Sequence, residues 1–142
     1  MTDHIARAER DIAAPPETVW DVITSPGPNP EIMFGARIES TWRVGDPITW
    51  SGEWEGRSYE DHGEILAIEP GSILRLTHFS PLTGLDDVPE NYHRLEFQLT
   101  PTAEGTHLAL SQDNNPTAEA AEHSAANWRT MLDGVASVAE RS

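Results

Sequence analysis

Short segments in which apolar and polar residues alternate fill most of the chain between residues 36 and 112. In 36–43, for example, Ala36, Ile38 and Trp42 alternate with charged or hydroxyl-bearing residues. Alternation with a period of two places the apolar side chains on one face of a half-buried strand. With Pro and Gly marking the turns, the pattern predicts seven strands, at 4–12, 36–43, 46–56, 59–68, 73–79, 92–100 and 106–112.

The C-terminal segment 115–140 follows a helical pattern instead. Asn115 suits the N-cap of this helix and Pro116 its first position. Two shorter pieces are expected after the first strand: a helix in the sequence PETVWDVIT, with Pro16 at its first position, and a helical or irregular piece at 31–34. In the long helix, apolar residues recur at intervals of three and four, so one side must be buried: Ala121, Ala125, Trp128, Leu132, Val135 and Ala139.

This order of elements predicts an α+β fold, with one domain spanning 1–142. Strands joined by short turns form a curved antiparallel sheet, and the single long C-terminal helix is available to cover one of its faces. In the first half of that helix, the apolar stripe consists only of small side chains. We therefore expect the sheet and the helix to leave a cavity beneath Ala121 and Ala125.

The amino-acid composition limits the classes of molecule that this protein is expected to bind. The chain has 142 residues, a formal charge of -15 and no cysteine. The negative charge opposes binding to nucleic acid and to anionic membranes, and the lack of cysteine excludes disulfides and iron–sulfur clusters. No apolar run approaches the ~20 residues of a membrane span, and the N-terminus lacks a secretion signal. We expect a cytoplasmic protein, and a homodimer is left open.

Polar residues on the apolar face are the candidate functional groups. His78 and His93 are in phase with the leucines of their strands, and as hairpin partners they should be neighbours. Asp61 and Gln112 are inward-facing by the same criterion. These groups can orient a ligand or exchange protons, although local hydrogen bonding is the simpler interpretation. The expected ligand-binding residues are Trp42, Trp50, Trp54, Tyr59, Asp61, His78, His93, Phe97, Gln112, Ala121, Ala125 and Trp128.

The sequence DPITWSGEWEG places Trp50 and Trp54 on one face of a strand with Gly52 between them. We interpret the tryptophans as a wall of the cavity, around which the glycine lets the strand bend. Ordinary core packing, with an aromatic ring covering the strand glycine, stays open as the alternative. The loop SPLTGLDDVPEN, 80–91, mixes apolar and acidic residues, and we expect it to be a mobile lid over the cavity mouth.

Metal and cofactor chemistry have little support. His62 is out of phase with the inward histidines and no HExxH motif is present, so no metal site is expected. The chain also lacks GxSxG, P-loop and GxGxxG motifs, which argues against serine hydrolases, nucleotide hydrolases and dinucleotide enzymes. No cofactor is predicted.

Several stretches, taken together and in order, resemble one superfamily. They are IAAPPETVWDVIT, GDPITW, GEILAIEPGSILRLTHF, LEFQLTPTAEGTHLALSQ and NWRTMLDGV. The chain resembles the START-like or SRPBCC superfamily, and within it the AHSA-type domains related to activators of the heat-shock ATPase chaperone. The resemblance implies a helix-grip fold, in which a sheet of about seven strands grips the C-terminal helix around a cavity for an apolar ligand. His78 and Gln112 depart from residues common in AHSA-type sequences.

Three functions from different classes remain open. We favour binding of a small apolar or aromatic molecule in a cavity of ~300 to 1,000 Å³. The second is an enzyme of cyclase, aromatase or dehydratase type, with His78 and His93 as acid and base. The third, which the resemblance implies, is a chaperone-ATPase regulator that acts through its surface.

Overall fold

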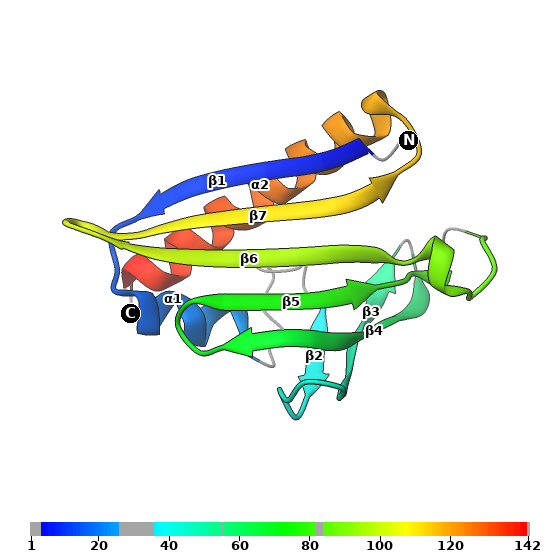
Figure 1. Ribbon diagram of the computed structural model, residues 1–142, viewed down its shortest axis with the longest axis horizontal. Helices are drawn as coiled ribbons and strands as arrows, with labels where there is room; N and C mark the ends of the chain where they lie inside the picture. The colour runs from blue at the N-terminus through cyan, green and yellow to red at the C-terminus, as the bar shows by residue number, and fades with distance from the viewer. Residues whose placement is uncertain (1–3, 26–35, 55, 82–83, 142) are drawn as a thin grey trace.

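The computed structural model describes residues 4–25, 36–54, 56–81 and 84–141 (Figure 1). Within these residues, seven strands and two α-helices follow one another along the chain. Their bounds are β1 His4–Ile12, α1 Pro16–Ile23, β2 Arg37–Ser40, β3 Pro47–Trp54, β4 Arg57–Glu69, β5 Ile73–His78, β6 His93–Thr102, β7 Gly105–Asn115 and α2 Ala118–Arg141, with a short 3₁₀ helix at Pro89–Asn91.

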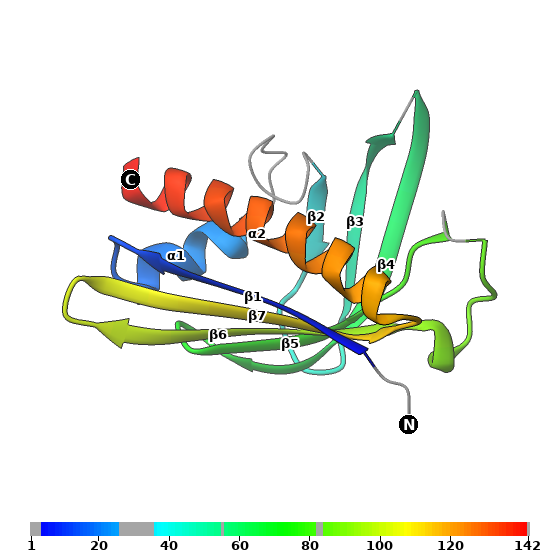
Figure 2. The same ribbon diagram turned by 90° about the horizontal axis from the view of Figure 1, so that it is seen from above.

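The strands form one antiparallel sheet in the order β1-β7-β6-β5-β4-β3-β2. Figure 2 shows β2, β3 and the end of β4 next to β3 rising steeply from the plane of the other strands, so that the sheet bends around the middle of α2. The expected α+β helix-grip fold is confirmed. The second short helical piece, expected at 31–34, lies outside the described residues.

Several predicted boundaries differ from those of the structure, and local hydrogen bonds explain two of the differences. The strand expected over 36–43 ends at Ser40 because Trp42 has a φ of 58° and its backbone N–H donates to Ser40 Oγ, which closes a turn. Asn115 is the last residue of β7 rather than the helix N-cap. The capping bond is instead donated by the Ala120 N–H to Thr117 Oγ1, at 3.0 Å.

The hydrophobic core lies between the concave face of the sheet and α2. Fully buried leucines and isoleucines of β3 to β7 form its floor, and the apolar stripe of α2 forms its roof. Burial of each such side chain contributes about 1.5–3 kcal/mol to folding, an upper estimate. Helix α1 lies beside the C-terminal half of α2 (Figure 2), and its Val19 is completely buried there. Neither described helix is long and apolar enough to span a membrane.

Candidate functional site

A cavity of about 190 Å³ lies between the bent part of the sheet and the middle of α2. Strands β3, β4, β5 and β7 supply the floor, and three positions of α2 supply the roof. The described residues that line it are Ala36, Trp50, Tyr59, Asp61, His78, Gln112, Ser124, Asn127 and Trp128.

An acid–histidine pair forms the polar part of this lining. Asp61 on β4 and His78 at the end of β5 face the same side of the sheet, and Asp61 Oδ2 lies 2.9 Å from His78 Nε2. Each side chain is only 15% exposed. The Trp50 indole and the imidazole meet in a T-shaped arrangement with a centroid distance of 4.9 Å. The pair is therefore held away from bulk water by an aromatic wall.

Each member of the pair also carries one polar atom that lacks a hydrogen-bond partner. Among the buried side-chain atoms of the described residues, Asp61 Oδ1 and His78 Nδ1 are the two left unsatisfied. Leaving a buried polar atom unpaired costs about 1–3 kcal/mol. Both side chains line the cavity, so a molecule within it can supply the missing hydrogen bonds.

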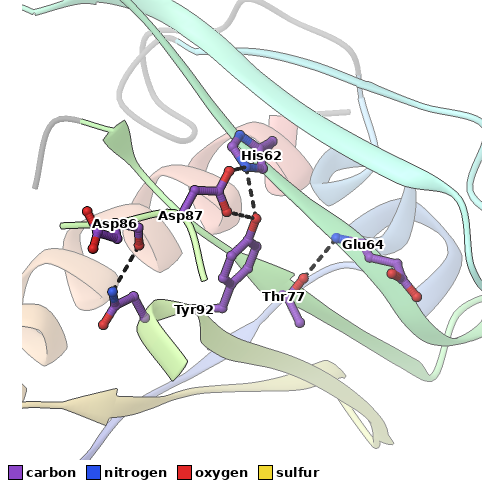
Figure 3. Close-up of polar contacts among 7 residues, drawn as sticks. His62, Glu64, Thr77, Asp86, Asp87 and Tyr92 are labelled. Carbon is purple, nitrogen blue, oxygen red and sulfur yellow. Dashed lines mark hydrogen bonds and ion pairs between the residues drawn. The ribbon is translucent and has the colours of Figure 1, made fainter. Parts of the chain in front are cut away.

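Gly63 positions the pair by letting β4 and β5 approach closely. A Cβ atom at residue 63 would lie 1.7 Å from the carbonyl oxygen of Thr77 and 2.5 Å from its carbonyl carbon. The neighbouring Glu64 N–H donates to Thr77 Oγ1 at 2.9 Å, as Figure 3 shows. Asp61 precedes this contact by two residues and His78 follows it by one, so the contact sets the distance between their strands.

Two further aromatic side chains of the lining, Trp128 and Tyr59, are held by specific contacts. Trp128 of α2 donates its indole N–H to Gln112 Oε1 at 3.0 Å, and both residues are buried. Tyr59 lies over Gly52, where a Cβ atom would come within 3.1 Å of the tyrosine hydroxyl. Burial, and then the Asp61 carboxylate, raise the pKa of Tyr59, which keeps its phenol neutral.

Other predicted site residues lie near the cavity or away from it. His93 pairs with His78 across β5 and β6, as expected, with ring centroids 6.3 Å apart, and its Nδ1 bonds to the Asp113 carbonyl at 2.8 Å. Phe97 is buried in the core. Trp42 packs against the core at the turn after β2, and the side chain of Trp54 lies outside the described part of the chain.

Ala121 and Ala125, which we expected to roof the cavity, are placed elsewhere. They line a shallow groove beside Ala6 of β1, where the N-terminal half of α2 crosses β1 (Figure 1). The cavity roof is one step around the helix, at Ser124 and Asn127. These two polar residues were not among the predicted site residues, because they flank the apolar stripe instead of belonging to it.

The opposite face of the sheet carries a larger groove of about 830 Å³. Asp87 and Glu90, from the loop that we expected to cover the inner cavity, line this outer groove. His62 Nε2 lies 2.9 Å from both Asp87 Oδ2 and the Tyr92 hydroxyl, which donates to Asp87 Oδ1 at 2.5 Å (Figure 3).

The polar groups of this outer cluster form their hydrogen bonds with one another. The hydrogen bond to Asp87 is the main cause that raises the pKa of Tyr92 to about 12, and the same bond is the main cause that lowers the pKa of Asp87. A tyrosine held neutral and a carboxylate already paired are poor reactants. We interpret the cluster as a structural contact that holds the described part of the 80–91 loop against β4. We therefore take the inner cavity as the candidate site.

Comparison with known proteins agrees with the fold. A family model described as Activator of Hsp90 ATPase homolog 1-like protein matches residues 13–140. No curated protein matches the chain.

Solved structures match over almost the whole chain. The solution structure of ChR145 from Cytophaga hutchinsonii is 45% identical, covers 96% of this chain and 94% of its own, and has a TM-score of 0.82. MLL2253 from Mesorhizobium loti is 26% identical, with 98% of each chain covered and a TM-score of 0.76. CV1439 from Chromobacterium violaceum, at 22% identity and a TM-score of 0.74 over 96% of this chain and 98% of its own, shares the fold. The chain therefore belongs to the Activator of Hsp90 ATPase homolog 1-like family, as an AHSA-type domain of the START-like superfamily.

Proposed function

We propose that this protein binds a small apolar or aromatic molecule in the cavity between the sheet and α2, within one domain that spans residues 1–142. Members of the family commonly bind ligands in such a cavity. In this chain the walls include two indole rings and a phenol ring. The polar side chains of the described lining are Asp61, His78, Gln112, Ser124 and Asn127. This mixture is typical of sites that take an apolar body and orient it by a small number of hydrogen bonds.

The observation that carries the proposal is the pair of unsatisfied atoms, Asp61 Oδ1 and His78 Nδ1, on side chains that line a cavity. A residue pair selected only for stability would have its hydrogen bonds completed within the protein. Apolar contacts alone would also have closed the space, because protein interiors pack to nearly crystalline density. The presence of a cavity and of unpaired polar groups in the same place supports this proposal.

The volume limits the size of that molecule. A closed apolar cavity of about 150 Å³ is known to bind benzene. The cavity of about 190 Å³ between the sheet and α2 suits one aromatic ring with a small substituent. It is smaller than the range of ~300 to 1,000 Å³ that we expected from typical ligand pockets, because Trp50, Tyr59 and Trp128 all project into the space between sheet and helix.

A cavity-filling substitution tests the proposal. Replacing Ser124 by phenylalanine should place a ring in the cavity, and it should weaken binding of nitrobenzene at least roughly tenfold, about 1.4 kcal/mol, in calorimetric titrations. Ala126→Phe is the matched control, because Ala126 lies on the exposed face of the same helix. Its affinity for nitrobenzene should equal that of the parent protein. No saturable binding to the parent, or equal binding to Ser124→Phe, would rule the cavity out as the binding site.

A further inference from the structure

We propose that the Asp61–His78 pair takes a proton from an acidic hydroxyl of the bound molecule, so that the ligand is a phenol or an enol rather than a plain hydrocarbon. This inference rests on the proposed function, because the hydroxyl must be delivered by a molecule in the cavity. It goes beyond the proposed function by specifying that the ligand carries an acidic hydroxyl and that His78 Nδ1 receives the proton.

The hydrogen-bond roles of the pair follow from its chemistry. An ionised carboxylate only accepts hydrogen bonds, so the 2.9 Å contact requires His78 Nε2 to carry the proton and donate it to Asp61 Oδ2. A neutral imidazole with a proton on Nε2 has a lone pair on Nδ1. When the imidazole is neutral, the two unsatisfied atoms, His78 Nδ1 and Asp61 Oδ1, are therefore both acceptors. The ligand must bring a donor.

The charges around the pair favour a neutral donor. A ligand carboxylate would be repelled by Asp61, and an ammonium would lose its hydration in a cavity walled by Trp50 and Trp128. A hydroxyl avoids both costs. Among neutral donors, an acidic hydroxyl gains most from a lone pair on nitrogen, because hydrogen bonds strengthen as the charge on either partner grows.

The ionisable neighbours of His78 do not compete for this role. Tyr59 is kept neutral by burial and by Asp61. His93, whose ring stacks at 6.3 Å, donates its Nδ1 proton to the Asp113 carbonyl. From α2 the described lining consists of Ser124, Asn127 and Trp128, none of which titrates. The carboxylate of Asp61 is thus the ionised group in contact with the imidazole.

Proton transfer within this arrangement leaves the total charge unchanged. The ligand O–H bond breaks, a bond from the proton to His78 Nδ1 forms, and the electron pair stays on the ligand oxygen. Asp61 remains ionised, and its hydrogen bond stabilises the imidazolium, as the carboxylate of a catalytic triad does. Before and after the step the site carries a net charge of minus one. The two new charges, on the imidazolium and on the ligand oxygen, form as an adjacent opposite pair, which stabilises both in the low-dielectric interior.

The test uses 4-nitrophenol, whose phenolate absorbs at longer wavelength than the phenol. The fraction of bound probe in the phenolate form is measured at saturating protein, about one unit below the pKa of the free phenol, where roughly a tenth is ionised. We expect about five times that fraction in the complex. In Asp61→Asn, the phenolate fraction of the bound probe should fall to that of the free phenol or lower. The matched control is Asp87→Asn, which alters the outer His62–Asp87 pair and should leave the spectrum unchanged.

The outcomes separate this inference from the proposed function. Nitrobenzene has the same ring and no hydroxyl. If it binds while 4-nitrophenol is excluded or binds only as the protonated phenol, the proton-acceptor role is overturned and cavity binding stands. Equal phenolate fractions in the parent protein and Asp61→Asn also overturn the role. Failure of both probes to bind contradicts the proposed function itself.

Discussion

Replacing Gly63 by alanine should destabilise the protein by about 3–5 kcal/mol, near the upper end of the range for single substitutions. The added methyl group would lie 1.7 Å from the backbone oxygen of Thr77. A backbone atom in a paired strand cannot move aside as the tip of a side chain can. β4 and β5 must separate instead, which breaks the ladder on either side of the contact. Urea-induced unfolding followed by circular dichroism measures the loss of stability.

A second glycine provides the control. Gly71 has a φ of 80° and nothing within 4 Å of an added Cβ, so Gly71→Ala meets only the strain of the left-handed conformation, about 1–2 kcal/mol. If Gly63→Ala costs no more than Gly71→Ala, the close approach of β4 and β5 is not what sets the spacing of Asp61 and His78. The destabilised variant should also bind nitrobenzene more weakly, because Asp61 and His78 lie on the two displaced strands.

Replacing Trp128 by alanine should cost about 3–5 kcal/mol, which is usual for deleting a buried tryptophan. Two losses add: the indole no longer packs between α2 and the sheet, and Gln112 Oε1 loses the donor at 3.0 Å that satisfies it. Trp128→Phe should cost less, because it keeps most of the packing and loses mainly the hydrogen bond, about 1–3 kcal/mol.

Thermal and urea unfolding of the two variants separate these contributions. Arg129→Ala, at the exposed neighbouring position on α2, should change stability by less than about 0.5 kcal/mol. A cost below about 1 kcal/mol for Trp128→Ala would mean that Trp128 is not a structural wall of the cavity. In that case the assignment of α2 as the roof of the cavity would be wrong.

Much of the fold could be predicted because alternation and helical periodicity are properties of consecutive residues. The inward positions of His78 and Asp61 followed from strand phase alone, and so did the separation of His62 onto the other face. The end of β2 could not be predicted, because a left-handed Trp42 is stabilised by a specific hydrogen bond and by packing rather than by its residue type.

The site was less predictable for a geometric reason. A cavity depends on how far two elements stand apart and how one is rotated over the other, and neither quantity is encoded in a periodic pattern. Small residues at Ala121 and Ala125 allow α2 to lie close to β1, so they closed the space that we expected them to open. The unsatisfied atoms of Asp61 and His78 became visible only once all their neighbours were placed.

Binding of a small molecule in the cavity between the sheet and α2 is tested most directly by the ¹⁵N–¹H spectrum during titration with nitrobenzene. This spectrum reports both the tryptophan side chains and the backbone N–H groups. The indole N–H signals of Trp50 and Trp128 should shift together and saturably, while that of Trp20 on α1 stays in place. Shifts confined to the backbone signals of Tyr92 and His62, in the outer groove, would contradict binding in this cavity, and so would an unchanged spectrum.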